Sequence, residues 1–187
     1  MSYRNGNYAA FYVEEPFTTS NLGANQKPDF RYYNLIKAFN KEDSDFNFND
    51  SHEKNYNVRD GSNWETLKER LRERLRNSKN IILFLSEATK ESKALKEEIE
   101  YGILKTKLPI IIVYPDCKRN NEVVKLNELT DKVKKLWNNL PILKKLMREV
   151  PTLHVPMKKD SIKKALEDKD FTVYGNIESG EYFYTTD

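Results

Sequence analysis

The chain has 187 residues, 33% of them charged and 38% hydrophobic, with a formal net charge of +3. That length allows one domain with a sizeable core, and the near balance of charges gives no indication of a nucleic-acid partner. One cysteine, two histidines and no apolar run of membrane-spanning length predict a cytoplasmic protein without a disulfide, a metal site or a membrane segment.

The first part of the chain alternates short apolar segments with long polar ones. "YAAFYV" over 8–13 predicts a strand, and a polar loop follows over 14–27. Proline at position 28 favours the start of a helix that continues to residue 40. "FNF" over 46–48 is a short strand candidate, and a second polar loop occupies 49–63.

The rest of the chain has clearer periodicity. Ser62 and Glu65 have capping-box spacing ahead of an apolar stripe at Leu67, Leu71 and Leu75, which predicts a helix. "IILFL" and "PIIIVY" lack polar alternation, which is typical of strands buried on both faces. The later elements are strands at 81–85, 109–114 and 152–155 and helices around residue 98 and over 128–140 and 160–169.

This alternation of strands and helices predicts an α/β fold with a five-stranded parallel sheet covered on both faces. We expect the flavodoxin-like, doubly wound strand order 2-1-3-4-5 within one domain over residues 1–170. The aromatic tail over 171–187 is predicted to form a small hairpin around "ESG". Its aromatic side chains pack on the domain or form a partner or self-association surface.

In such sheets, ligands bind beyond the carboxyl ends of the strands, at the switch point in strand order. The loop after Val13 and Ser86, after the third strand, are expected to line that crevice, and the loop "NDSHEKN" can fold over it. Long loops without regular structure in a compact domain are usually functional or mobile.

Three glutamates stand in "SKALKEEIEYG", and their helical phases differ. At about 100° per residue, Leu95 and Gly102 face inward, Glu97 points to solvent and Glu98 borders the apolar stripe. Glu98 is therefore the carboxylate that can be partly desolvated. If the helix begins near Ser86, Glu98 lies about three turns into it, and its distance from the crevice depends on that start.

Over roughly residues 8–170 the chain resembles a TIR domain, in the divergent group that includes the Thoeris antiviral defence TIR proteins. The matching features are the five strand–helix units, the loop "FNDSHEKN" in the position of the BB loop, and "SKALKEEI". Many TIR enzymes read S-x-W-C-x-x-E-L there. This chain keeps Ser92 and Glu98 but has Ala94 in place of the tryptophan and Leu95 in place of the cysteine.

The resemblance implies an NADase in which Glu98 is essential for cleaving the nicotinamide–ribose bond of NAD⁺. It assigns Phe17 and Thr18 to the loop that cradles the nicotinamide end, and Asp50, Ser51 and His52 to the loop beside the nucleotide. It also implies a cyclic or conjugated ADP-ribose signal that diffuses to a separate downstream effector, and a possible homo-oligomer. NAD⁺ is then the substrate, and no cofactor is expected.

One carboxylate is sufficient for this reaction. Glycoside hydrolysis usually needs a second carboxyl group to protonate the leaving group, whereas nicotinamide departs from NAD⁺ as a neutral molecule. What remains is to stabilise the ribosyl oxocarbenium ion and to orient the ribose hydroxyls. The acceptor decides the product, and the sequence does not choose between water, an internal atom and another small molecule.

Two other functions fit the same sequence features. A non-catalytic TIR-like adaptor would use the same fold and loop for homotypic assembly. An enzyme resembling nucleoside 2-deoxyribosyltransferases would use a catalytic glutamate on nucleosides in place of NAD⁺. Measuring nicotinamide release with a Glu98→Gln control separates both from an NADase.

Overall fold

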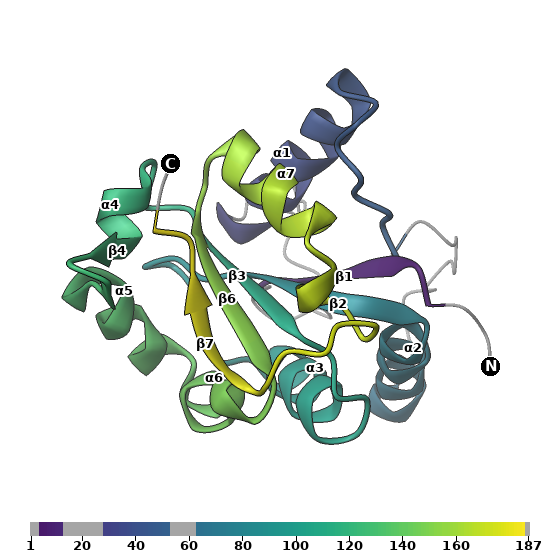
Figure 1. Cartoon of the computed structure of the whole chain (residues 1–187). Helices are drawn as coiled ribbons and strands as arrows, with labels where there is room; N and C mark the ends of the chain where they lie inside the picture. The colour runs from purple at the N-terminus through teal and green to yellow at the C-terminus, as the bar shows by residue number, and fades with distance from the viewer. Residues whose placement is uncertain (1–3, 13–27, 53–62, 186–187) are drawn as a thin grey trace.

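A five-stranded, all-parallel sheet organises the protein, and its strand order is β1-β2-β3-β6-β7 (Figure 1). The structure is a computed structural model that describes residues 4–12, 28–52 and 63–185. The strands are β1 (Gly6–Ala10), β2 (Ser78–Phe84), β3 (Ile110–Tyr114), β6 (Pro151–Pro156) and β7 (Gly180–Phe183).

Helices cover both faces of this sheet (Figure 1). One face carries α1 (Pro28–Glu42) and α7 (Lys159–Glu167), and the other carries α2 (Trp64–Arg76), α3 (Lys93–Leu104) and α6 (Pro141–Leu146). The shorter elements are α4 (Asn120–Val123), α5 (Asp131–Leu136), the 3₁₀ turns η2 (Trp137–Asn139), η3 (Met147–Glu149) and η4 (Lys169–Phe171), and the two-residue strands β4 (Val124–Lys125) and β5 (Glu128–Leu129). Among the described residues, every helix is too short or too polar to span a bilayer.

The central strands divide their side chains between two separate cores. In β2, Ile81 and Leu83 belong to the core beneath α2 and α3, whereas Ile82 and Phe84 belong to the core beneath α1 and α7. All four side chains are fully buried. The apolar runs without alternation therefore do mark strands buried on both faces, and the α/β doubly wound fold is confirmed.

The predicted strand at 46–48 is wrong. Phe46 and Phe48 bury their rings in the core beneath α1, but their backbone N–H groups bond to nearby acceptors: Phe46 N–H to the Asp43 carbonyl, and Phe48 N–H to the Phe46 carbonyl and the Asn40 amide oxygen. Because these donors are satisfied locally, no ladder extends along β1. A single parallel bridge between Asn7 and Asp50 marks the place of the expected second strand. The expected order 2-1-3-4-5 is therefore found without its strand 2, and the fifth strand of the sheet is β7, at the other edge.

The tail also differs from its prediction, since it adds a strand to the main sheet. β7 pairs with β6 in parallel, with Leu153 opposite Tyr182 and His154 opposite Phe183. A hairpin requires two antiparallel strands, and this tail contributes one strand to an existing parallel edge. The division of the chain at residue 170 stays a prediction.

A buried polar chain lies where β3, β6 and β7 meet. The Trp137 indole N–H donates to the Tyr114 hydroxyl over 3.0 Å, and that hydroxyl lies 2.7 Å from His154 Nδ1. Pairing the hydroxyl hydrogen with Nδ1 leaves the His154 proton on Nε2, which lies 3.8 Å from Glu181 Oε1. Burial lowers the His154 pKa to about 3, so this histidine is neutral near pH 7.

Candidate active site

Helix α3 places Glu98 close to the carboxyl edge of the sheet. The Ser92 side chain caps the helix by accepting from the Leu95 backbone N–H over 3.1 Å, so the helix begins at Lys93. Glu98 is its sixth residue, about 8 Å along the axis. The expectation that the helix begins near Ser86 is therefore wrong, and Glu98 lies nearer the crevice than three turns would put it.

The apolar face of α3 has the predicted phase, with Leu95, Glu98, Ile99, Gly102 and Ile103 all buried. Gly102 allows α3 to lie directly on the sheet, because a Cβ atom there would come within 2.4 Å of the Ile81 Cδ1 atom on β2. This close approach buries Glu98, and only 8% of the residue remains exposed.

Glu98 is held by a tyrosine from the first strand. The Tyr8 hydroxyl donates to Glu98 Oε1 over 2.7 Å, and Tyr8 is itself fully buried. Burial raises the Glu98 pKa to about 8, although the Tyr8 hydrogen bond and the positive charge of Arg74 act in the opposite direction. The Glu98 carboxyl is therefore largely protonated at pH 7 and can ionise when a cation comes beside it.

A small pocket opens in front of this carboxyl group. Its volume is about 130 Å³, and it lies where β1 ends and α2 and α3 pack together. It is lined by Ala9, Phe11, His52, Leu67, Leu71, Ser92, Ala94 and Glu98. A mainly apolar wall with a few convergent polar groups is the usual chemistry of a small-molecule site. Within the described ranges, no three acidic, histidine or cysteine side chains gather in a group that could hold a metal ion.

Among the described residues of the polar loop, 49–52 and 63, His52 is the one that lines this pocket. Its Nε2 atom lies 2.9 Å from the Ala9 carbonyl oxygen, and its Nδ1 atom lies 3.1 Å from Arg74 Nη1. A carbonyl oxygen only accepts and a guanidinium only donates, so the proton must be on Nε2 and Nδ1 must accept. Only a neutral imidazole meets both conditions. Burial lowers the His52 pKa in agreement with this, and the charge of Asp50 opposes the shift.

We expect His52 to keep the Nε2–H tautomer throughout the neutral range. Long-range ¹H–¹⁵N spectra of the imidazole rings, assigned with His52→Gln, measure both the tautomer and the pKa. The His52 pKa should lie below 6.5, the ordinary value of an exposed histidine, so His52 should still be neutral at pH 6.5. An Nδ1–H tautomer, or a pKa above 6.5, would contradict the hydrogen bonds to Ala9 and Arg74.

The other residues of the strand-two loop have different positions. Asp50 accepts hydrogen bonds from the Tyr33 hydroxyl and from the His52 backbone N–H, and it faces a different cavity. The Ser51 hydroxyl donates to the Asn7 carbonyl over 2.9 Å, which fastens the segment to β1. Their contacts therefore position His52, and neither residue lines the Glu98 pocket.

Ser86 is buried after β2 but does not line the Glu98 pocket. Its hydroxyl donates to Asp29 Oδ1 over 2.8 Å, and the Thr89 hydroxyl donates to Asp29 Oδ2 over 3.0 Å. This cluster fastens the first turn of α1 to the sheet, and burial raises the Asp29 pKa. Phe17 and Thr18 lie outside the described residues.

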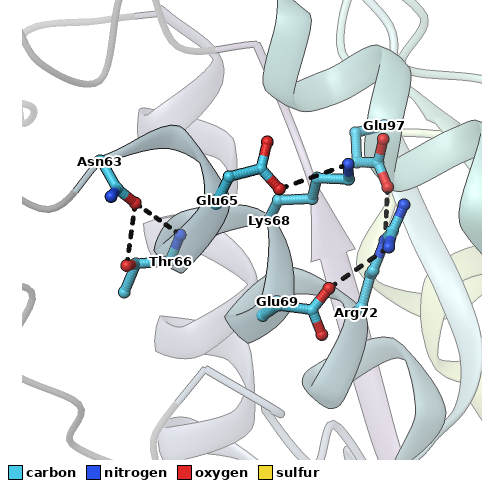
Figure 2. A network of polar contacts seen from close by, with 7 residues as sticks. All are labelled: Asn63, Glu65, Thr66, Lys68, Glu69, Arg72 and Glu97. Carbon is cyan, nitrogen blue, oxygen red and sulfur yellow. Dashed lines mark hydrogen bonds and ion pairs between the residues drawn. The ribbon is translucent and has the colours of Figure 1, made fainter.

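Glu97 has a partner, so its predicted position in open solvent is wrong. The Arg72 Nε atom on α2 donates to Glu97 Oε1 over 2.7 Å, and only 17% of the Glu97 side chain is exposed. Figure 2 shows Arg72 between Glu97 and Glu69, with a contact to each carboxylate. Glu97 therefore joins two helices, while the neighbouring Glu98 faces the pocket.

Tyr8 and Arg74 also act at this site, and neither was predicted from the sequence to do so. Tyr8 lies in a segment predicted to be a buried strand, and a buried tyrosine hydroxyl usually has a hydrogen-bond partner. The sequence therefore indicated a polar contact at Tyr8. Arg74 stood among several charged residues of one helix and offered no such signal.

One comparison with known proteins bears on this site. Residues 8–120, more than half of the chain, match the family described as Thoeris protein ThsB, TIR-like domain. The matched range includes the last three residues of β1 and the whole of α1, α2, β2, α3 and β3, and with them the described residues that line the Glu98 pocket.

Proposed function

Because this chain belongs to the Thoeris ThsB TIR-like domain family, we propose that it cleaves the nicotinamide–ribose bond of NAD⁺, with Glu98 as the catalytic residue. The family associates the chain with antiviral defence. The observation that carries the proposed chemistry is a buried carboxyl group, bonded to Tyr8, that faces a small and mostly apolar pocket.

The charges of the reaction suit this pocket. NAD⁺ brings a flat cationic ring, and the apolar walls of Ala9, Phe11 and Leu71 suit such a ring. The bond between ribose and the ring nitrogen breaks, and its electron pair leaves with nicotinamide, which becomes neutral. Positive charge then moves onto the ribose, where an ionised Glu98 stabilises it before an acceptor bonds to the same carbon.

Substrate binding also accounts for the ionisation of Glu98. In the empty pocket, burial favours the protonated carboxyl group. A cation within about 4–6 Å favours the charged form, so binding of NAD⁺ lowers the Glu98 pKa and releases its proton to solvent. Tyr8 then donates its hydrogen bond to a carboxylate, which is the stronger form of that contact.

This ionisation predicts the pH dependence of the rate. The value of kcat/KM follows the free enzyme, so it should rise about tenfold per pH unit below about 8 and level off above that value. Tyr8→Phe removes a hydrogen bond that lowers the Glu98 pKa, so the midpoint should move upward by about one pH unit. Rates of nicotinamide release between pH 6 and 10 measure both effects.

Tyr101→Phe is the matched control, because Tyr101 is also on α3 and its hydroxyl accepts a hydrogen bond from Arg76. It should leave the midpoint in place. If Tyr8→Phe lowered the rate equally at every pH, the contact with Glu98 would not act on its ionisation.

The direct test of the proposed function is to incubate the purified protein with NAD⁺ and to follow its products by mass spectrometry. Release of nicotinamide supports it. The partner product identifies the acceptor: ADP-ribose for water, or a cyclic or conjugated form for a signal that activates a separate effector. The proposal requires that nicotinamide release depends on Glu98. If no nicotinamide were released under any assembly condition, the non-catalytic adaptor role would be favoured.

The transferase-like alternative makes a different prediction. An enzyme of that kind exchanges the base of a nucleoside, so it should act on deoxynucleosides with a free base as acceptor. Assaying NAD⁺ and a deoxynucleoside in parallel separates the two activities. Self-association stays a prediction, and varying the protein concentration in the same assay examines it.

A further inference from the structure

A second cavity, larger than the Glu98 pocket, opens at the opposite end of the sheet. Its volume is about 830 Å³, within the range of small-molecule sites. The lining comes from the residue before β1, from the start of β2, from the last turn of α1 and the segment over 44–50, and from residues at and after the end of α7. None of the described residues that line it also lines the Glu98 pocket.

The floor of this cavity is apolar and its walls carry amides. Phe46, Phe48 and Leu166 are buried in the core below. Around them stand Asn5 and Asn47, whose side-chain amides have no hydrogen-bond partner among the described residues. An apolar floor with amide groups beside it suits a flat ring whose edge both donates and accepts hydrogen bonds. Asparagine pairs with the edge of adenine in this way.

Lys79 on β2 adds a cation to the lining of this cavity. The residue is half-buried, and burial lowers its pKa. In the part of the chain that the structure describes, its ammonium group makes no ion pair. Of the acids that line the cavity, Asp50 is engaged by Tyr33 and by the His52 backbone, and Glu167 is exposed.

A partly buried ammonium group that forms no ion pair among the described residues is an unfavourable arrangement, and an anionic ligand would supply the missing partner. Exposed Lys169 on the cavity wall adds a second positive charge. From these contacts we propose that the cavity binds a nucleotide, with its base on the apolar floor beside Asn5 and Asn47 and its phosphate at Lys79. This site is separate from Glu98 and does not rest on the proposed NAD⁺ cleavage.

Isothermal titration of the full chain with AMP tests this site. AMP should bind, and Lys79→Met, which keeps the aliphatic stem, should weaken binding about tenfold or more because it removes a charged contact to phosphate. Lys90→Met is the matched control, since Lys90 is exposed and does not line the cavity. Glu98→Gln should also bind AMP normally, because Glu98 does not line this cavity.

Several results would overturn the proposal. They are no heat with AMP at millimolar concentration, equal affinity of Lys79→Met and the parent, or loss of binding in Glu98→Gln. Adenosine binding as tightly as AMP would exclude a phosphate contact, and inorganic phosphate binding as tightly would exclude a base contact. If Lys79→Met does not fold, Asn47→Leu, at an exposed position, provides the test. An unchanged affinity of this variant for AMP would contradict the proposed contact between the base and the Asn47 amide.

Discussion

Replacing Glu98 with glutamine is expected to lower the rate of nicotinamide release from NAD⁺ by at least about 100-fold. Glutamine keeps the size and the hydrogen bond from Tyr8, but it cannot carry the negative charge that stabilises the ribosyl cation. Removing one electrostatic contact to a transition state inside a water-excluded site typically lowers kcat by about 10²–10³. Single-turnover nicotinamide release, measured at saturating NAD⁺, reports this loss directly.

Glu97→Gln is the matched control, because it makes the same chemical change one residue away. Glu97 on α3 accepts a hydrogen bond from Arg72 on α2 (Figure 2) and does not line the pocket. This variant should therefore release nicotinamide at the parental rate. A dead Glu97→Gln beside an active Glu98→Gln would refute the assignment. The free energy of unfolding at pH 8 checks that the variant folds. Glu98→Gln should be at least as stable as the parent, because it removes a carboxyl group whose charged form is disfavoured by burial.

His154→Gln is expected to make the protein more resistant to acid. The folded state holds His154 neutral with a pKa of about 3, whereas an unfolded chain protonates it near 6.5. The contribution of this histidine is therefore complete above about pH 6.5 and is lost as the pH falls from there toward 3. Between pH 7 and 5 the parent should lose about 2 kcal/mol of unfolding free energy through His154 that the variant does not lose.

Urea titrations at pH 7, 6 and 5 measure this difference as a change of slope with pH. Two other buried groups, His52 and Glu98, also change the free energy of unfolding over this pH range, in opposite directions. His52, with its lowered pKa, adds a further loss toward acid, whereas Glu98, with its raised pKa, gains stability as the pH falls from about 8. Because both are present in parent and variant, their contributions cancel in the comparison. Equal slopes in the two proteins would show that His154 is not held neutral in the fold.

Several features of this protein were predictable from local patterns. The segments that form β2 and β3 are apolar at nearly every position, and this composition predicts strands whose two faces are both buried. The phase of α3 followed from helical geometry, since residues three and four positions apart share a face, and it placed Glu98 beside Leu95 on the buried side. These predictions held because they depend on neighbours in sequence.

The starts of α2 and α3 were less predictable than that of α1, because each depends on which polar side chain caps the helix. Ser62, expected to cap α2, lies outside the described residues, and the Asn63 side chain accepts from the Thr66 N–H instead. Ser92 caps α3, and that one contact decides how far Glu98 lies from the edge of the sheet. Ser62 and Asn63 are adjacent in the first segment, and Ser86 and Ser92 are six residues apart in the second, so sequence position alone does not decide which side chain caps the helix.

The sequence by itself determined that this chain folds as a doubly wound α/β protein and that Glu98 borders its core. Only the tertiary structure decided that Tyr8 holds Glu98, that Arg74 and Ala9 set the His52 tautomer, and that β7 adds a parallel strand beside β6. These contacts join residues far apart in the chain. Local periodicity describes which face of an element is buried, but it carries no information about which distant side chain shares that space.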